Sequence, residues 1–558
     1  MRIIVGILTI LLFFFQSCKE EKKVEIIKIP VKKVQNVNKE VLEELAHYYN
    51  SAFGDTLLII NNDSLYTYRF FGRIFNPDSI YFTQNGRISP LGDSLFSVIK
   101  NSRMYGLFAP DYHALTLDSL QKNFYDSTEK YYNASCLAAF EVYSKDAFFK
   151  FGAHLNKGRF NPDTLLKEWR PQKLDTNWIS ILKSGIQNKK IKQAYDSLEP
   201  KHLGYKFLQK AFRNYLMENK DAEWDSISFV GIQDTVEWRN KLIERLRATG
   251  DYNDSLKLND SLKLAKALKS FQKKFNLDPD GKLGKYTKQA LNLSKETTIR
   301  QMEMALERWR WEPAKYPEKY AVVNIPSADL HVWEWYKKKK LDTLVLKSKV
   351  VVGKPENQTP LLKSKISNML IYPYWNVPFS IAWKEILPMV KNDTNYLHKH
   401  NFEVINHRGE VVTNLGKLNW KKYNKENLPI RFRQRIGNEN SLGVCKFNFH
   451  SKYDVYMHDT NSKRYFKTFY RYQSHGCIRL EKYMELARFL IRDDTLRIPY
   501  DTLNAYFERE QQVKINLKKP LPLYVKYFTV GVDSIQQLNM FLDIYKKDLQ
   551  MMKMIYNN

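Results

Sequence analysis

The stretch Ser474-His-Gly-Cys-Ile-Arg-Leu480 places a cysteine directly after a glycine and beside a helical run. We expect the Cys477 sulfur at a turn leading into a helix N-terminus, where the macrodipole favours the thiolate. Nineteen residues upstream, Tyr456-Met-His-Asp-Thr460 places His458 at the end of a strand-like run. A cysteine nucleophile needs a base, and His458 is the candidate.

The residues beside this pair suggest supporting roles. The second ring nitrogen of His458 needs an acceptor to fix the tautomer, and a backbone carbonyl can serve. His475 is expected to orient the loop or its backbone donors. The N–H groups of Gly476 and Cys477 are placed to stabilise an oxyanion formed by attack on an amide. Arg479 suits a carboxylate held by paired hydrogen bonds.

On spacing alone, one cysteine with two histidines permits three interpretations: a thiol acyl-transfer enzyme, a zinc site or a buried cluster without function. Zinc would need a fourth ligand or a Cys-x-x-Cys pair, and neither is nearby in the sequence. A papain-like peptidase would place its nucleophile well before its histidine, whereas here His458 precedes Cys477. On these grounds a thiol acyl-transfer enzyme and a buried cluster without function both stay open. Asp459 is expected to make a structural hydrogen bond, because it points to the opposite strand face from His458.

Further segments extend the motif. They are Asn324-Ile-Pro326, Val351-Val-Gly-Lys-Pro355, Thr359-Pro360, Tyr372-Pro-Tyr-Trp-Asn-Val-Pro378, Lys384-Glu-Ile-Leu-Pro388 and Leu442-Gly-Val-Cys-Lys-Phe447. Together with the motifs around Cys477 and His458, these segments resemble the sequences of L,D-transpeptidases with a YkuD-type catalytic domain. It is similar to the large Gram-negative subtype, which carries a helical scaffold, a peptidoglycan-binding module and a lid. The resemblance is dense over about residues 229–548.

The resemblance implies a two-step acyl transfer on peptidoglycan stem peptides. The Cys477 thiolate would attack the carbonyl after diaminopimelate in a tetrapeptide, release D-Ala and leave a thioester. A second diaminopimelate amine then gives a 3-3 crosslink, a D-amino acid gives exchange, and water gives L,D-carboxypeptidase activity. The implied catalytic residues are Cys477, His458, His475 and Gly476, and the implied substrate-binding residues are Arg479, Ser474, Tyr372, Trp375 and Asn376. No metal or organic cofactor is implied, and carbapenems would acylate the cysteine.

A second interpretation is a noncatalytic wall-binding lipoprotein in which the motif is kept only as a part of the fold. The intact Cys477 and His458 argue against it. Residues 226–295 resemble a three-helix peptidoglycan-binding module, on the strings Ala267-Leu-Lys-Ser-Phe-Gln-Lys-Lys-Phe275 and Asp280-Gly-Lys-Leu-Gly284 with Thr287. The alternative for this module is a generic three-helix spacer that has lost glycan affinity.

The first eighteen residues predict export. Arg2 precedes the apolar run Ile3–Phe15, and Ser17-Cys18 is followed at once by charged residues. The run is shorter than the roughly 20 residues of a membrane-spanning helix. It resembles a bacterial lipoprotein signal in which Cys18 is lipidated, although an uncleaved signal anchor is the alternative. We expect a periplasmic, lipid-anchored protein, with membrane and peptidoglycan stem peptides and glycan strands as partners.

The order of segments predicts a multidomain α+β protein. We expect a signal at 1–18, a tether at 19–40, a helical scaffold at 41–225, the three-helix module at 226–295 and a mainly β catalytic domain at 305–548 with a lid inserted at 379–440. Module helices are expected at 236–248, 262–275 and 286–291, a catalytic-domain helix at 481–492, and sheet-closing strands at 513–517 and 521–532.

Length and composition agree with this organisation. A chain of 558 residues needs several folding units, and 43% hydrophobic residues supply core material. The formal net charge of +29 favours anionic partners, but the basic residues are spread along the chain without a compact nucleic-acid-binding motif, so no nucleic-acid partner is expected. The four cysteines agree with an exported protein that does not depend on disulfides. Cys136 and Cys445 are expected to be packed residues.

Overall fold

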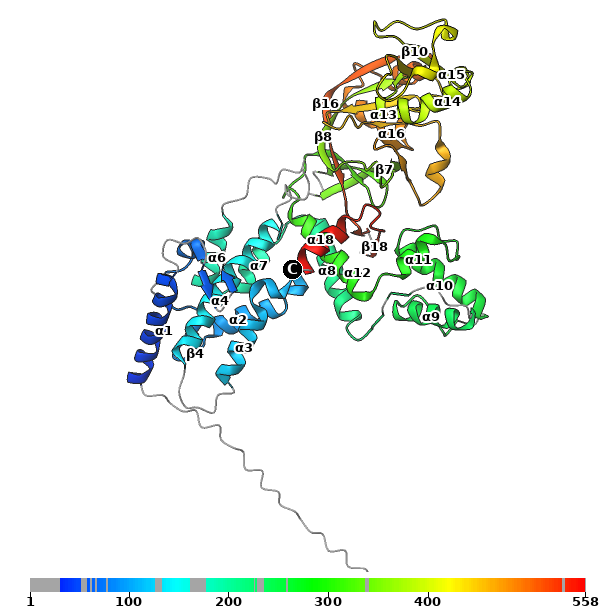
Figure 1. Cartoon of the computed structure of the whole chain (residues 1–558). Helices are drawn as coiled ribbons and strands as arrows, with labels where there is room; N and C mark the ends of the chain where they lie inside the picture. Colours follow the sequence, from blue (N-terminus) through cyan, green and yellow to red (C-terminus); the bar gives the residue numbers. More distant parts are fainter. Residues whose placement is uncertain are drawn as a thin grey trace, which may run out of the picture.

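The computed structural model describes residues 31–51, 58–60, 63–65, 68–76, 79–125, 133–160, 177–224, 226–227, 235–256, 259–336, 341–533 and 537–556. The predicted signal, with Cys18, lies outside these residues. Within them, no helix combines the length and apolar character needed to cross a membrane. The described chain is a multidomain α+β protein, as the sequence predicts (Figure 1).

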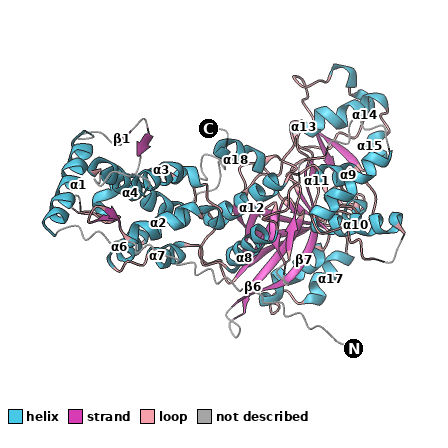
Figure 2. Cartoon of the chain, turned by 90° about the horizontal axis from the view of Figure 1, so that it is seen from below, coloured by secondary structure: helices cyan, strands magenta, loops and turns pink. Residues whose placement is uncertain are grey.

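The N-terminal region is helical and contains only short strands. Its helices are α1 (Val31–Ser51), α2 (Pro90–Lys100), α3 (Ala114–Tyr125), α4 (Ala134–Lys157), α6 (Trp178–Gln187), α7 (Ile191–Leu198) and α8 (Leu203–Glu218). Its strands are β1 (Leu58–Ile60), β2 (Asp63–Leu65), β3 (Thr83–Gln84) and β4 (Arg87–Ile88). Helix α1 begins at Val31, within the segment expected to be a tether. Apart from α8, which packs against α12, these elements lie at the opposite end of the molecule from the large sheet (Figures 1 and 2).

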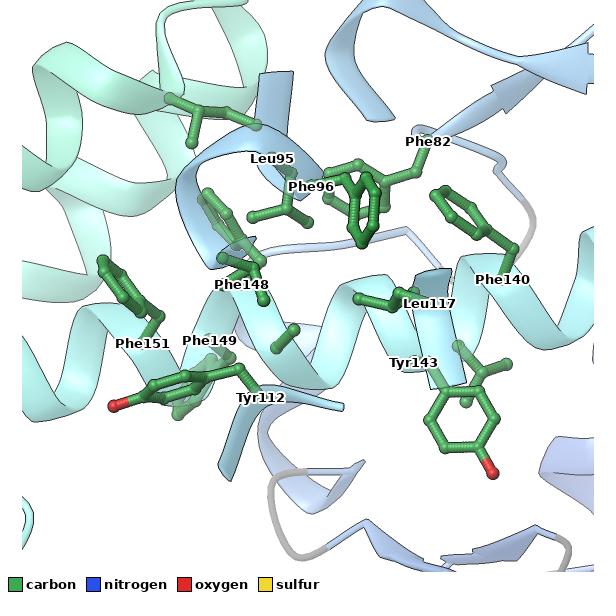
Figure 3. Packing of buried hydrophobic residues seen from close by; sticks show 14 of the residues in the cluster. Phe82, Leu95, Phe96, Tyr112, Leu117, Phe140, Tyr143, Phe148, Phe149 and Phe151 are labelled. Carbon is green, nitrogen blue, oxygen red and sulfur yellow. The ribbon is translucent and has the colours of Figure 1, made fainter. Parts of the chain in front are cut away.

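Helix α4 is the centre of this region. The side chain of Asn133 caps it by accepting a hydrogen bond from the Cys136 N–H, and the chain leaves the helix at Gly158, where φ is +82°. Aromatic side chains from α4 and from the segments around it pack into one buried cluster, as Figure 3 shows for Phe82, Phe148 and Tyr112. Burial of this cluster holds the helices around α4.

The three-helix module contains α9 (Thr235–Ala248), α10 (Asp260–Lys274) and α11 (Lys285–Leu291). These helices confirm the three predicted ones within two residues at each end. Gln272 fixes the turn between α10 and α11, because its amide donates to Asp280 at 2.7 Å and to Thr287 at 3.1 Å. Helix α12 (Lys295–Arg310) then connects the module to the sheet region.

The large sheet has the order β14-β7-β15-β13-β12-β8-β16-β5-β6, and β6 also pairs with β7. The sheet therefore closes on itself through β7. Its strands are β5 (Lys319–Asn324), β6 (Asp329–Tyr336), β7 (Leu341–Gly353), β8 (Leu362–Ile371), β12 (Cys445–Phe449), β13 (Met457–His458), β14 (Tyr472–Ser474), β15 (Ile478–Leu480) and β16 (Val513–Lys526). Helices α16 (Tyr483–Ile491) and α17 (Tyr500–Glu508) follow β15, and α16 confirms the predicted helix.

The end of the chain differs from the prediction. The expected strand at 513–517 and the first part of the one expected at 521–532 form one long strand, β16, which lies inside the sheet between β8 and β5. The register shift between Asn516 and Leu521 interrupts its alternation, which is why its sequence looks like two strands. A separate pair, β17 (Val530–Val532) with β18 (Leu538–Met540), follows. Helix α18 (Lys547–Tyr556) then contacts α12, placing the C-terminus at the centre of the molecule (Figure 1).

A small subdomain is inserted between β8 and β12. It contains β9 (Trp375–Asn376), α13 (Phe379–Ile381), a π-helical turn (Ala382–Ile386), α14 (Leu387–Asn392), α15 (Tyr396–Lys399), β10 (Phe402–Ile405) and β11 (Arg431–Gln434). Its strands form a separate sheet in the order β10-β11-β9, and its apolar side chains form a separate cluster. The segment expected to be polar and helical is thus a mixed unit with its own core.

Candidate active site

Cys477 lies in a turn between two short strands, β14 and β15. Strand β15 begins at the next residue, and the following helix, α16, begins only at Tyr483. The expectation that the sulfur sits at a helix N-terminus is therefore wrong, because Ile478–Leu480 pairs with strands on both sides. Gly476 has φ +113°, a conformation that favours glycine, which is why a glycine precedes the cysteine.

His458 lies on the strand beside the cysteine. Strand β13 pairs with β15 in parallel, with Met457 opposite Ile478 and His458 opposite Arg479. The Ile478 N–H donates to the Tyr456 carbonyl at 3.0 Å, which carries the pairing back to the cysteine. Side chains alternate along a strand, so Cys477 projects from the same face of the sheet as Arg479, two positions later. His458 lies opposite Arg479, and it therefore shares this face with Cys477.

Two cations flank the imidazole in the same row of the sheet. Arg479 lies opposite His458 on one side, and Lys446 of β12 lies opposite it on the other. The His458 residue is only 4% exposed. Burial first, and then the positive charges of Arg479 and Lys446, lower the pKa of His458 to about 3. The ring is therefore neutral at physiological pH.

Main-chain groups face the imidazole ring of His458. Nδ1 of His458 is buried and makes no hydrogen bond of ordinary geometry with the described residues. Backbone groups of Asp459 and Leu442 face the ring and raise its pKa, against the larger effects of burial and charge. The Asp459 carboxylate instead accepts from the Val444 N–H at 3.1 Å and pairs with Lys463. Asp459 thus makes the expected structural contact.

The Cys477 thiol is largely buried and is surrounded by donors and cations. Burial raises its pKa, while hydrogen bonds from the Tyr456 main chain and phenol and the charges of Lys446 and Arg479 lower it. The Tyr456 phenol also contacts the Trp375 side chain of the inserted subdomain. Lys446 Nζ lies 3.7 Å from the centre of the Tyr456 ring. Burial is the largest of these effects, so the pKa of the Cys477 thiol is raised on balance, and the donors and cations reduce that rise.

Ser474 closes the turn that carries the cysteine. Its hydroxyl donates to the Cys477 carbonyl at 2.6 Å and accepts from the Gly476 N–H at 3.1 Å. Thr359 donates to the Gly476 carbonyl at 2.8 Å. The Gly476 N–H is therefore engaged within the turn. Of the two N–H groups predicted to hold an oxyanion, the Cys477 N–H remains as the candidate in this conformation.

His475 is exposed and contacts the inserted subdomain. Its Nε2 lies 2.6 Å from a carboxylate oxygen of Glu385. Glu385 belongs to the π-helical turn Ala382–Ile386, and such turns are frequent at functional sites. The contact joins the subdomain to the residue immediately before the Gly476-Cys477 turn.

The remaining predicted substrate residues separate into two groups. Trp375 is half-buried and Asn376 is exposed; both lie on β9 in the inserted subdomain. Tyr372 is 5% exposed and packs into the core cluster of the large sheet. Cys445 is fully buried in that cluster, as expected, and Cys136 is half-buried in the scaffold region.

Two residues of the site, Lys446 and Tyr456, were not predicted from the sequence. Tyr456 could have been found by its spacing, since it precedes His458 by two positions and so shares its strand face. Lys446 follows the buried Cys445 and therefore faces the other side of the sheet. Its place beside His458 depends on the pairing of β12 with β13, which no local pattern predicts.

Comparisons with known proteins agree with this site. Residues 318–498 match the YkuD family, described as "L,D-transpeptidase catalytic domain"; residues 240–291 match "Putative peptidoglycan binding domain"; and residues 76–212 match "Scaffold domain". A Haemophilus influenzae protein described as "Putative L,D-transpeptidase" is 31% identical over 262 residues, or 46% of this chain. The alignment covers 50% of that relative. These matches confirm the resemblance to L,D-transpeptidases predicted from the motifs.

Proposed function

We propose that this protein is a peptidoglycan L,D-transpeptidase that uses Cys477 as its nucleophile and forms 3-3 crosslinks. The observation that carries the proposal is the placement of Cys477 and His458 on one face of adjacent strands, within a segment similar to the L,D-transpeptidase catalytic domain. The module similar to a peptidoglycan-binding domain supports the same substrate.

The first step is acylation. As sulfur attacks the carbonyl that follows diaminopimelate, its proton moves to His458, one of whose ring nitrogens has no partner among the described residues. The Cys477 N–H donates to the developing oxyanion. The tetrahedral intermediate then breaks its carbon–nitrogen bond, and the proton passes from His458 to the departing amine of D-Ala. A thioester on Cys477 remains.

The second step returns the thiol. A diaminopimelate side-chain amine attacks the thioester, His458 accepts a proton from that amine, and the sulfur leaves and is reprotonated. The product is a 3-3 amide crosslink. A free D-amino acid in place of this amine gives exchange, and water gives hydrolysis to the tripeptide. Arg479, Ser474, Trp375 and Asn376 are the residues we assign to stem-peptide binding or to shaping its cleft.

A carbapenem provides a direct test of the nucleophile. Incubation of the protein with meropenem should add the mass of the drug to Cys477, as located by peptide mass spectrometry, and Cys477→Ser should abolish this adduct. Cys445 serves as the internal control, because it is fully buried and should remain unmodified. A folded wild-type protein without an adduct would contradict the proposal and favour a noncatalytic wall-binding protein.

Purified tetrapeptide muropeptides then identify the acceptor. A 3-3 dimer with release of D-Ala supports crosslinking. If only D-amino-acid exchange is observed, the protein is an exchange enzyme and the crosslinking function is wrong. If only the tripeptide forms, the protein is an L,D-carboxypeptidase. The matched control is His458→Gln, which keeps a polar side chain but cannot act as a base and should lower turnover by about 100-fold or more.

The export signal predicts where this reaction takes place. Domains that act on peptidoglycan indicate an extracytoplasmic location. We propose that Cys18 carries lipid and anchors the protein to the envelope membrane, on the basis of the sequence around it. Metabolic labelling with an alkyne fatty acid should tag the full chain, and Cys18→Ala should remove the label. A labelled Cys18→Ala protein, or an unlabelled wild type, would contradict lipidation at this residue.

A further inference from the structure

The side chains of Lys446 and Arg479 are half-buried cations on the face of the sheet that carries Cys477. Within the described part of the chain, neither forms an ion pair with a carboxylate; the contacts found for them are to aromatic rings, Lys446 over Tyr456 and Arg479 over Tyr465. Removing a cation from water without an opposite charge is costly. The Cys477 sulfur, once it is ionised, can supply that charge to both cations, and Arg479 also faces the Tyr465 phenol.

The position of Lys446 is set by three contacts. Its residue lies opposite His458 in the β12–β13 pairing, so both side chains share one face. Its ammonium lies over the Tyr456 ring, at 3.7 Å from the ring centre. The phenol of the same tyrosine hydrogen-bonds to the Cys477 thiol. Lys446, Tyr456 and Cys477 thus form a short chain of contacts across three strands.

We propose that Lys446 is a positioning residue that stabilises the Cys477 thiolate, through its positive charge and by fixing the Tyr456 phenol that donates to sulfur. The proposal deepens the proposed function and rests on it. His458 accepts the proton during attack, while Lys446 supplies the opposing charge for the sulfur. Burial lowers the pKa of the Lys446 ammonium and raises that of the Cys477 thiol, and the attraction between the two groups acts against both effects.

The charged and titratable neighbours of the sulfur among the described residues come from three strands and from the inserted subdomain. Strand β12 contributes Lys446, β13 with the residue before it contributes His458 and Tyr456, and β15 contributes Arg479. From the inserted subdomain, Trp375 reaches Tyr456 and Glu385 reaches His475. The neutral state of His458 matters here, because a neutral imidazole cannot stabilise the thiolate by charge in the resting protein. Lys446 and Arg479 are the cations that remain.

The pH dependence of Cys477 alkylation tests the proposal without any stem peptide. The full-length protein is treated with iodoacetamide between about pH 5 and 10, and modification of the Cys477 peptide is followed by mass spectrometry. In Lys446→Met the midpoint should rise by about one pH unit, which corresponds to roughly a tenfold smaller thiolate fraction at pH 7. Lys446→Arg should keep the wild-type midpoint within about 0.3 unit, since it keeps the charge.

Lys514 offers a matched control. It lies in the same cross-strand row, opposite Leu370, which in turn lies opposite Lys446, but it is exposed and two strands farther away. Lys514→Met removes the same charge and should leave the midpoint unchanged. An equal shift in Lys446→Met and Lys514→Met, or no shift in a folded Lys446→Met, would overturn the proposal. If Lys446→Met does not fold, Lys446→Gln is measured in its place.

The meropenem adduct on the wild-type protein separates this inference from the proposed function. An adduct together with an unshifted Lys446→Met midpoint supports the transpeptidase and refutes the role of Lys446. A shifted midpoint without any adduct refutes the proposed function while establishing the electrostatic effect on the thiol.

Discussion

Arg479 lies directly opposite His458 in the parallel pairing of β15 and β13. The guanidinium opposes protonation of the imidazole, and together with burial it lowers the pKa of His458 to about 3. The same charge favours the thiolate of Cys477, which lies two residues earlier, in the turn before β15. The site therefore holds a neutral base and a thiol whose ionisation is assisted by cations, which leads to an expectation about pH.

Arg479→Met should move the acid limb of cysteine acylation to higher pH. Without the guanidinium, the imidazolium is less unfavourable, so the pKa of His458 rises and the neutral base is lost at a higher pH. Measuring meropenem acylation between about pH 3 and 8 checks this. Arg479→Lys should retain the wild-type limb, and an unmoved limb in Arg479→Met would show that Arg479 does not control the base.

The contact between His475 and Glu385 predicts a restraint on the inserted subdomain. Glu385→Ala should loosen the subdomain above the catalytic turn, because it removes a partly exposed hydrogen-bonded pair worth about 0.5–1 kcal/mol. Hydrogen exchange should increase over residues 382–391, and iodoacetamide should modify Cys477 about two- to fivefold faster. Glu426→Ala, at an exposed position in the same subdomain, is the control and should change neither rate.

The three-helix module contacts the chain just before the catalytic turn. Tyr286 stacks on Tyr470 with ring centres 4.8 Å apart, and the Phe469 N–H donates to Asp278 at 3.1 Å. Tyr286→Ala should release the module from this surface. Turnover of intact peptidoglycan should then fall several-fold, while meropenem acylation should stay within about twofold of wild type.

The control for the module contact is Lys266→Ala, at an exposed position on α10. It should preserve both activities. A parallel fall of acylation and peptidoglycan turnover in Tyr286→Ala would show that the residue supports the catalytic turn itself, contrary to the prediction.

The sequence predicted the members of the site better than their environment. The motif identified Cys477 and His458, because a cysteine nucleophile and a histidine base are recognisable from residue type, and the strings around them resemble those of L,D-transpeptidases. It wrongly predicted a helix directly after the cysteine, where the structure has strand β15. A segment of three residues such as Ile478–Leu480 is compatible with the start of a helix as well as with a short strand. Pairing with β13 and β7 decides between them, and such long-range pairing also places Lys446 beside His458.

The fold shows the same limit. The module helices were predicted closely, because their amphipathic periods and turn residues are local signals. The interior position of β16 was not predicted, because strand order in a closed sheet depends on contacts between distant segments. The Gly443 conformation is another case: φ is +63°, and a β-carbon there would lie 2.2 Å from the Asp459 carboxylate, a contact visible only in three dimensions.

Glu141 is expected to be essential for the stability of the scaffold region. One of its carboxylate oxygens accepts from the N–H groups of Phe82 and Thr83, each at 2.6 Å, and the residue is fully buried. Glu141→Ala leaves these donors unpaired and should cost about 3–5 kcal/mol of unfolding free energy. Urea unfolding followed by circular dichroism measures the loss, and Glu43→Ala, at an exposed site on α1, should change stability by less than about 0.5 kcal/mol.

His331 on β6 predicts how stability depends on acid. Burial, together with the charge of Lys347 opposite it, lowers the pKa of His331 to about 4. An unfolded histidine has a pKa near 6.5, so between about pH 6.5 and 4 the unfolded chain binds a proton that the folded chain does not. The contribution of His331 is therefore complete above about pH 6.5 and is lost progressively as the pH falls toward 4.

His331→Gln removes this titration. Relative to wild type, its unfolding free energy should improve by about 1.4 kcal/mol for each pH unit between about 6 and 5. Urea unfolding followed by tryptophan fluorescence at pH 7, 6 and 5 gives the comparison. His407→Gln, at an exposed position in the inserted subdomain, should keep the wild-type pH dependence. Parallel curves for His331→Gln and wild type would mean that His331 is protonated in the folded protein, and burial would then not control its charge.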